Sequence, residues 1–529
     1  MLEFESSPMF RVRYLVAFFL CLAVSLPANA AGKKRENSGG LVHEIDKLID
    51  DSDAAHAFWG IDVVSLDSGR SLAAVNPDKL FAPASNAKLL TTAAVLGLIG
   101  PNYRFRTTVE TLGTLDKYGR LDSDLVLVGR GDPNLSGRTL PYSMHTERKA
   151  SPMQVLQLLA DQLVQHGLKY VDGDVVADDS YYVWERYGEG WSQDDLAREW
   201  GAPVSALTIN DNVIFVNLMP ADRPGERAFL NITPFPEYYK IDNRVITTPA
   251  GSEPRTVSIN REPGSNVLTF WGNIPKDDPG FGEALAIEDP ADFSARLFRE
   301  LLEQRGVTIY GRTRIRHTEL ASLQTFSVTS MASGGGDATR PANPAPLVLA
   351  SYQSQPVIED LRVINKVSQN LHAELMLRLL GKEKGNSGSI QGGLEVLRGF
   401  LVNAGLKPEQ FAMFDGSGLS REDLVTPEAL VALLRYCHQQ PWGKAFEDTL
   451  PVAGVDGSLA DRFRNTAAAG VVRAKTGSLT HVYSLSGYAT TKAGDHVAFS
   501  VMTNDNNMAT KKVLDTIDRI VLRIVESTN

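Results

Sequence analysis

The stretch S-N-A-K-L-L-T-T-A-A-V-L-G-L, residues 85–98, decides the fold of this 529-residue chain. It is almost wholly apolar and follows Pro83, which predicts a buried helix with Ser85 at or just before its first turn. Residues three apart share a helix face, so Lys88 should lie beside the Ser85 hydroxyl. Apolar surroundings disfavour the ammonium form and make Lys88 a candidate base for a nucleophilic serine. The alternative is a lysine that snorkels to solvent.

Two further motifs favour a catalytic interpretation. The first is K-V-S-Q-N, residues 366–370. The second is A-K-T-G-S, residues 474–478, in an alternating stretch that predicts a strand edge, with a second strand over 497–502. Gly477 would let a ligand approach the backbone there. Serine-lysine, S-x-N and K-T-G occur in the order found in serine acyltransferases that recognise β-lactams.

The chain resembles penicillin-binding proteins and serine β-lactamases. More narrowly, it resembles the low-molecular-mass class C penicillin-binding proteins, the D-alanyl-D-alanine carboxypeptidase/endopeptidase family. A long insertion carries that match, with L-V-G-R-G-D-P-N-L at 127–135 and G-D-V-V-A-D-D-S-Y-Y at 173–182. So does D-G-S-G-L-S-R at 415–421. The resemblance covers nearly all of the chain after residue 40. It implies a β-lactamase/transpeptidase-like catalytic domain, an antiparallel sheet flanked by helices.

Periodicity and composition predict a multidomain α/β chain. The catalytic domain comprises residues 41–103 and 345–529, and residues 104–344 form a large, mostly β accessory insertion. The glycine- and proline-rich stretch 333–346 marks the return point. Within the insertion, turn residues and the resemblance together suggest a nested subdomain at about 218–280.

The N-terminus predicts a secretory signal peptide over residues 1–30, followed by a mobile leader at 31–40. Two arginines precede an apolar run that is too short for a permanent membrane span, and Ala28-Asn29-Ala30 fits a cleavage site. Met9 is an alternative start. We therefore expect a periplasmic protein with no integral membrane anchor after cleavage.

The mature chain would keep one cysteine, Cys437, so no intramolecular disulfide is possible.

The amphipathic stretch 511–526 predicts a helix that packs on the sheet, with a membrane-surface anchor as the alternative. The net charge of −10 gives no support to a nucleic-acid partner. We expect no cofactor and no metal. His372 and Glu374 are the nearest approach to a metal-ligand pair, and we interpret them as a helix surface.

The resemblance implies how the motif residues act on an acyl-D-alanyl-D-alanine peptide. Ser85 attacks the penultimate carbonyl and Lys88 is the candidate base. The backbone N–H groups of Ser85 and Ser478 stabilise the oxyanion. Ser368 relays a proton to the leaving amine. Asn370 holds the substrate backbone or the lysine.

Substrate recognition is implied in the same way. Lys475 and Thr476 bind the terminal carboxylate, for which an ammonium and a hydroxyl are suited. Asp178 matches an acid that contacts the amine of the peptide's diamino acid; the equal alternative is a turn aspartate that caps its own backbone. The expected partners are peptidoglycan stem peptides, with β-lactams as covalent inhibitors.

Two other functions stay open at this point. A serine β-lactamase would share the motifs, but the chain is roughly twice as long as that single-domain fold needs. A non-catalytic wall-binding protein with an acyltransferase fold is the other, and the intact motifs argue against it. The sequence does not separate carboxypeptidase from D,D-endopeptidase activity.

Overall fold

The computed structural model describes residues 40–50, 53, 55–140, 142, 149–234, 238–262, 264–322 and 345–528. The predicted signal peptide, nearly all of the leader and most of the 333–346 linker lie outside the described residues. In the part of the chain that is described, no helix has the length and apolar character needed to cross a bilayer.

The catalytic domain is built on a five-stranded antiparallel sheet of order β2-β1-β23-β22-β21. The first and last parts of the chain meet in it, because β1 pairs with β23 along its whole length. The strands are β1 (Phe58–Ser65), β2 (Ser71–Val75), β21 (Arg473–Leu479), β22 (Val482–Thr490) and β23 (His496–Asn504).

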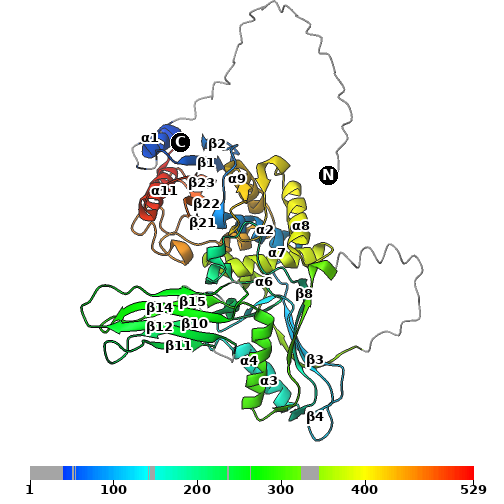
Figure 1. Ribbon diagram of the computed structural model, residues 1–529. Coiled ribbons are helices and arrows are strands. Elements are labelled where there is room, and N and C mark those ends of the chain that lie inside the picture. Colours follow the sequence, from blue (N-terminus) through cyan, green and yellow to red (C-terminus); the bar gives the residue numbers. More distant parts are fainter. Residues whose placement is uncertain are drawn as a thin grey trace, which may run out of the picture. The chain divides into compact units, whose positions relative to one another are not determined.

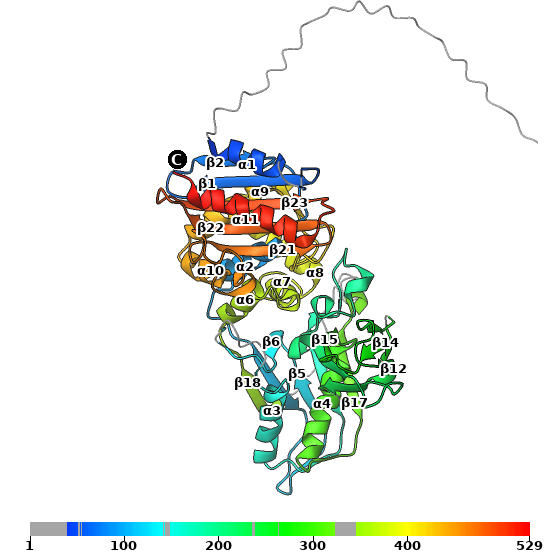
Figure 2. The same ribbon diagram turned by 90° about the vertical axis from the view of Figure 1, so that its left-hand side faces the viewer.

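Two helices from opposite ends of the chain cover one face of this sheet, α1 (Gly40–Asp50) and α11 (Thr510–Glu526) (Figure 2). α11 buries Ile517, Ile520 and other apolar residues at helical spacing against the sheet core. The amphipathic C-terminal stretch therefore packs on the sheet, as predicted, and its apolar stripe is removed from water there.

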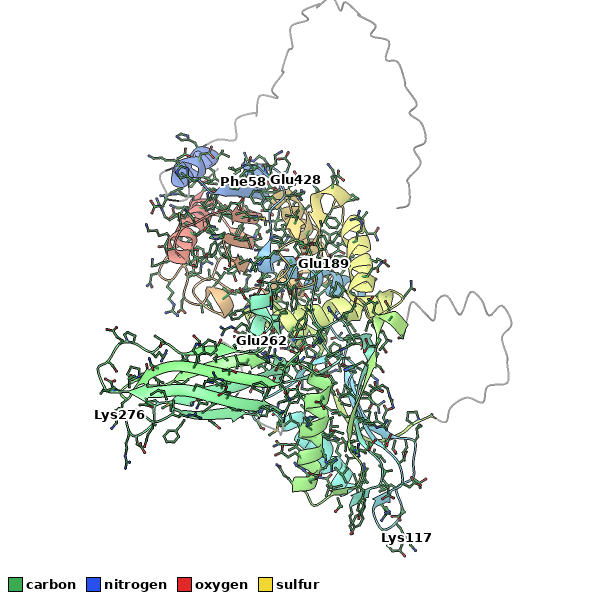
Figure 3. All side chains as sticks on the ribbon, in the orientation of Figure 1. Phe58, Lys117, Glu189, Glu262, Lys276 and Glu428 are labelled. Atoms are coloured by element: carbon green, nitrogen blue, oxygen red, sulfur yellow. The ribbon has the colours of Figure 1, made fainter. Side chains whose placement is uncertain are left out.

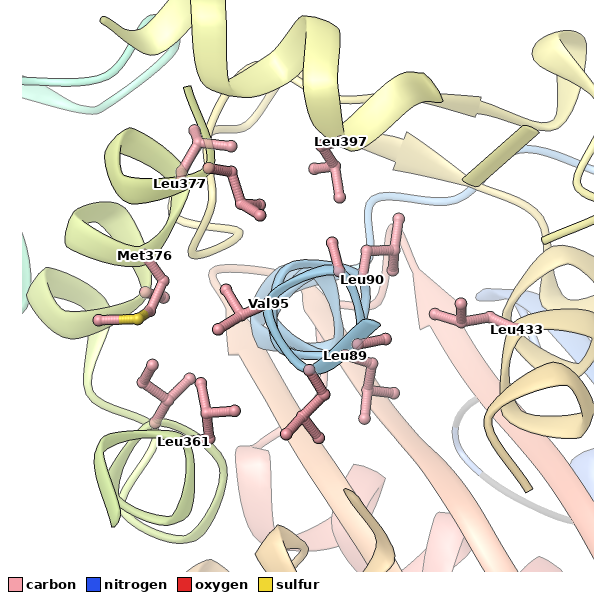
Figure 4. Packing of buried hydrophobic residues seen from close by; sticks show 14 of the residues in the cluster. Leu89, Leu90, Val95, Leu361, Met376, Leu377, Leu397 and Leu433 are labelled. Carbon is pink, nitrogen blue, oxygen red and sulfur yellow. The ribbon is translucent and has the colours of Figure 1, made fainter. Parts of the chain in front are cut away.

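The central helix of the other face is α2 (Ala87–Leu98), whose residues 87–96 are all buried. Figure 4 shows Leu89, Leu90 and Val95 of α2 surrounded by leucine and methionine side chains from neighbouring helices. A helix that is apolar on every side is stable only in such a position. The helices around it are α6 (Val357–Lys366), α7 (Asn370–Lys384), α8 (Ile390–Asn403), α9 (Pro427–His438) and α10 (Gly443–Thr449).

The accessory domain is the lower part of Figure 1 and contains a second five-stranded sheet of order β17-β8-β5-β3-β18. Helices α3 (Gln154–Gln165) and α4 (Pro290–Gln304) pack on it and close a separate hydrophobic core. The strands are β3 (Arg106–Thr111), β5 (Leu125–Val128), β8 (Val175–Val183), β17 (Thr313–Thr318) and β18 (Leu347–Gln353).

The edge strand β18 lies beyond the return point that composition predicts. It pairs with β3 in the accessory sheet, so the chain completes this sheet before it re-enters the catalytic domain after residue 353. Linker composition marks the stretch before β18 and carries no information about which sheet the following strand joins.

Two three-stranded sheets, β11-β10-β15 and β12-β14-β13, lie in the stretch for which a nested subdomain is predicted. Together they span residues 213–286, slightly more than the predicted 218–280. Their strands are β10 (Val213–Met219), β11 (Phe229–Thr233), β12 (Lys240–Thr248), β13 (Ser258–Asn260), β14 (Val267–Pro275) and β15 (Phe281–Ala286). The short strands elsewhere are β4 (Arg120–Leu121), β6 (Asp132–Leu135), β7 (Tyr170–Val171), β9 (Leu207–Ile209), β16 (Thr308–Ile309), β19 (Phe411–Ala412) and β20 (Leu424–Val425).

Candidate active site

Ser85 lies in a single 3-10 turn, η1 (Ala84–Asn86), directly before α2. Lys88 is in the first turn of α2 and its Nζ lies 2.9 Å from Ser85 Oγ. The spacing therefore brings the two residues together as predicted. The exposed fraction of Lys88 is 0%, so the snorkelling alternative is wrong. Ser85 is partly exposed, which leaves its hydroxyl accessible to a substrate.

The surroundings of Lys88 favour its neutral form. Burial lowers the pKa of Lys88 to about 7, while nearby carboxylates, among them Asp415 and Glu374, act in the opposite direction. Its Nζ also donates to Asn370 Oδ1 and to the backbone oxygen of Ser417, both at 2.6 Å. A lysine with a pKa near 7 has a large neutral fraction at physiological pH and can accept a proton.

A second lysine and serine lie beside the first pair. Lys475 Nζ donates to Ser368 Oγ and to the backbone oxygen of Thr476, both at 2.8 Å. Burial lowers the pKa of Lys475 well below its usual range, and the charge of Lys88 lowers it further. Ser368 has a φ of 70°, in the left-handed region that serine rarely adopts. Such strain persists where the surroundings impose it, typically at functional sites.

The strand β21 carries K-T-G along the edge of the catalytic sheet, next to η1. A Cβ at Gly477 would lie 2.2 Å from Ser484 Oγ, 2.8 Å from the Pro83 oxygen and 3.1 Å from the Ser85 nitrogen. Only glycine lets the strand pass this close to the nucleophile. The sequence predicts a glycine for ligand approach; the structure adds close packing on the nucleophile turn as a reason for it.

The other residues of the predicted carboxylate site share this edge. Ser478 is exposed and Thr476 is partly exposed. Thr476 Oγ1 lies 2.7 Å from the Oγ of Ser458, which is also exposed. Sequence reasoning missed Ser458, because a lone serine in G-V-D-G-S-L carries no motif.

The D-G-S-G-L-S-R segment supports Lys88. Asp415 is fully buried and accepts hydrogen bonds from the backbone N–H groups of Ser417, Gly418 and Ser420 at 3.0, 2.6 and 2.7 Å. These bonds fix the loop whose carbonyl at Ser417 accepts a hydrogen bond from Lys88 Nζ. The sequence singles this segment out by resemblance only, without a role.

The structure does not bring Asp178 into this cluster. Its carboxylate accepts from the backbone N–H and hydroxyl of Ser180 at 3.0 and 2.5 Å, and pairs with Arg316 at 2.7 Å. The bond to the N–H two residues on is the local cap of the alternative interpretation. These bonds lie within the accessory domain, and a role toward a diamino acid stays a prediction.

A different part of the insertion touches the active site. The indole Nε1 of Trp191 donates to Asp415 at 2.9 Å, and the backbone N–H of Arg421 donates to the Gly190 oxygen at 3.1 Å. Glu189, labelled in Figure 3, lies among catalytic-domain side chains. Every motif of the acylation site is outside the insertion, so the sequence had no signal for these contacts.

The interpretation of His372 and Glu374 as a helix surface is wrong, since the exposed fraction of both is 0%. His372 Nε2 lies 3.0 Å from Asp211 Oδ1, and Glu374 pairs with Arg378 at 2.9 Å. α7 is covered by other elements, so its polar side chains pair with protein groups instead of water. In the described ranges no three histidine, cysteine or acidic side chains gather as a metal site.

Fold and site together point to a class of protein, the serine-type enzymes in which a serine lies beside a buried lysine. Sequence comparison narrows the class. Residues 41–332 and 336–524 match the D-Ala-D-Ala carboxypeptidase 3 (S13) family, and the chain belongs to this family. It is a serine-type D-Ala-D-Ala carboxypeptidase, and the predicted family and enzyme class are confirmed.

Several relatives span most of the chain. The D-alanyl-D-alanine carboxypeptidase of Actinomadura sp. (strain R39) is 32% identical over 497 residues, which cover 92% of this chain and 84% of that protein. The D-alanyl-D-alanine carboxypeptidase DacB of Haemophilus influenzae is 25% identical over 445 residues, which cover 83% of this chain and 84% of that protein. The crystal structure of penicillin binding protein 4 from Haemophilus influenzae matches with a TM-score of 0.76 at 23% identity, covering 91% of this chain and 99% of that one. This match confirms the predicted fold class.

Proposed function

We propose that this carboxypeptidase removes the terminal D-alanine of peptidoglycan stem peptides through an acyl-enzyme on Ser85. The observation that supports this most is the fully buried Lys88, with a pKa of about 7, at 2.9 Å from Ser85 Oγ. Ser85 Oγ attacks the penultimate carbonyl and its proton passes to Lys88 Nζ. The bond to the terminal D-alanine breaks, and water then hydrolyses the ester on Ser85.

The leaving amine needs a proton when that bond breaks. We assign the relay to Ser368, whose hydroxyl accepts a hydrogen bond from Lys475. We assign the oxyanion to the backbone N–H groups of Ser85 in η1 and Ser478 in β21. Donors held in place before the reaction stabilise the developing charge without reorganisation.

Lys475 and Thr476 would bind the terminal carboxylate. Burial and the charge of Lys88 disfavour the ammonium form of Lys475 in the free enzyme. A bound carboxylate acts in the opposite direction, because an opposite charge favours the charged form. Substrate binding would thus hold Lys475 charged while Lys88 stays neutral as the base.

Trapping the acyl-enzyme tests the assignment. Incubation with benzylpenicillin should add the mass of one intact penicillin, and peptide mapping should place it on Ser85. An acyl group on another residue would contradict the mechanism. Rapid turnover of the penicillin would instead favour the β-lactamase alternative, and an intact protein that takes up no label would favour a wall-binding role.

We infer D,D-endopeptidase activity as a second activity from the resemblance, and parallel assays on a pentapeptide and a cross-linked dimer would measure the two activities. We also infer a periplasmic location from the predicted signal peptide. N-terminal sequencing of the mature protein should begin at Ala31, and retention of the first 30 residues would contradict it.

A further inference from the structure

One buried carboxylate links the accessory domain to the S-Q-N motif. Asp211 lies in the 3-10 turn η4 (Asn210–Asn212) and is 1% exposed. All three residues of η4 have left-handed φ angles, between 52° and 57°. Asp211 Oδ2 accepts from Arg138 at 2.6 Å and from Gln369 Nε2 at 3.2 Å, and Oδ1 lies 3.0 Å from His372 Nε2.

Gln369 is the central residue of S-Q-N, a position to which the sequence interpretation gave no role. Its Oε1 accepts the Leu371 N–H at 2.9 Å and caps α7. Its Nε2 donates to Asp211. The side chain therefore ties the first turn of α7 to the accessory domain.

Hydrogen bonds hold the residues on both sides of the strained Ser368. Two residues before it, Lys366 donates to Asp456 at 2.5 Å and to the Leu450 oxygen at 2.9 Å, both in the catalytic domain. One residue after it, Gln369 is bonded to the accessory domain. A left-handed serine persists only where its neighbours hold it, and here one of those neighbours is bonded to the insertion.

Asn370 receives a second contact from the insertion. Its Nδ2 donates to the backbone oxygen of Trp200 at 2.9 Å, which leaves Oδ1 facing Lys88 Nζ at 2.6 Å. The accessory domain therefore sets the orientation of the amide that meets the base.

We propose that Asp211 is a positioning residue for acylation, which acts through Gln369 and His372 to hold the S-Q-N segment against the two active-site lysines. The accessory domain then takes part in acylation through these contacts. Asp211 touches no reacting atom in this scheme. Its loss should slow the chemical step and leave the binding of the ligand nearly unchanged.

The test compares two buried aspartates of the insertion. Asp179 is the control, because it is 2% exposed and bonded to Ser205 at 2.7 Å and His317 at 2.6 Å, both within the accessory domain. Asp211→Asn should lower the maximal rate of acylation by benzylpenicillin about 10²-fold, the scale of a small misplacement of reacting groups. The half-saturating concentration should stay within about threefold.

Asp179→Asn should lower the melting temperature and leave both kinetic constants near the wild-type values. Wild-type acylation by Asp211→Asn would overturn the proposal. So would an equal loss of rate in Asp179→Asn, since that would make the effect one of general stability.

A second variant covers the case in which Asp211→Asn does not fold, since it leaves the Arg138 charge buried without its partner. Gln369→Ala keeps the Arg138–Asp211 pair and should lower the acylation rate about tenfold. Ser389→Ala removes a comparable helix cap, on α8, and should not change the rate. Where Asp211→Asn and Gln369→Ala both fold, the variant that carries both changes should acylate no more slowly than Asp211→Asn alone. A wild-type acylation rate in Gln369→Ala would overturn the proposal. So would a double variant whose loss of rate is the product of the two single losses.

Discussion

The two lysine–serine pairs of the active site are held by different parts of the chain. Ser85 and Lys88 lie within one turn of each other, and the D-G-S-G-L-S-R segment of the same domain receives the lysine. Ser368 and Asn370 lie where α6 meets α7, and their supporting bonds reach 158 and 170 positions back in the chain, into the accessory domain. Local spacing brings Ser85 and Lys88 together, while Ser368 and Asn370 are held by residues from two distant parts of the chain.

Removal of the nucleophile should have the largest effect. Ser85→Ala should abolish covalent labelling by penicillin, because the attacking oxygen is gone. The fold should be kept, since Ser85 is partly exposed and its backbone turn can form with alanine. Intact-protein mass spectrometry and thermal melting check both points. Labelling at the wild-type level would show that the local pair is not the acylation centre.

Removal of the Lys88 amine should reduce acylation slightly less than removal of the Ser85 hydroxyl. Lys88→Ala should slow acylation by about 10²-fold or more, the scale of a lost general base. Lys79→Ala is the control, a lysine whose side chain is 58% exposed. Acylation rates and melting curves would be recorded together. A folded Lys88→Ala protein with a normal rate would remove the lysine from the mechanism.

The pH dependence of the wild-type enzyme follows from the same pair. Only the neutral amine accepts a proton, so the acylation rate should rise with pH through the Lys88 pKa of about 7 and then level off. Two pH units below that pKa about one lysine in a hundred is neutral, so the rate should be about 10²-fold below its plateau. A rate that is flat from about pH 5 to about pH 9 would argue for another base.

Asn370 links the Ser85–Lys88 pair to the accessory domain, because its Oδ1 faces Lys88 and its Nδ2 bonds to the Trp200 oxygen. Asn370→Asp places a carboxylate beside Lys88, which should raise the lysine pKa and move the rising limb of the pH profile to higher pH. It also loses the donor to the Trp200 oxygen. At neutral pH the rate should fall about tenfold for each unit by which the pKa rises. An unshifted limb would mean that this side chain does not face the base in solution.

Asp178 should give the smallest effect. Asp178→Ala should leave acylation by penicillin within about twofold and lower D-alanine release from a natural pentapeptide about threefold, if the acid holds the diamino acid. Stability should change by less than about 1 kcal/mol, because the Arg316 partner is 54% exposed. Both reactions would be measured on one preparation. Wild-type rates of the Asp178→Ala variant on both substrates would favour the interpretation of Asp178 as a local cap.

Much of the catalytic domain was predictable because its signals are local. The apolar 85–98 stretch, the alternating strands around K-T-G and the amphipathic 511–526 stretch each carry their periodicity within one element, and each forms the element expected of it. The Ser85–Lys88 contact follows from helix geometry alone.

The sequence by itself determined the class of enzyme and the contact between Ser85 and Lys88. The tertiary structure decided that β18 completes the accessory sheet, that His372 and Glu374 are buried, and that the insertion bonds to the S-Q-N segment. The β18 pairing, the His372 contact with Asp211 and the bonds to the S-Q-N segment depend on partners far away in the chain, and such pairings leave no period or motif. They follow from which surfaces must be covered once the helices and sheets pack together.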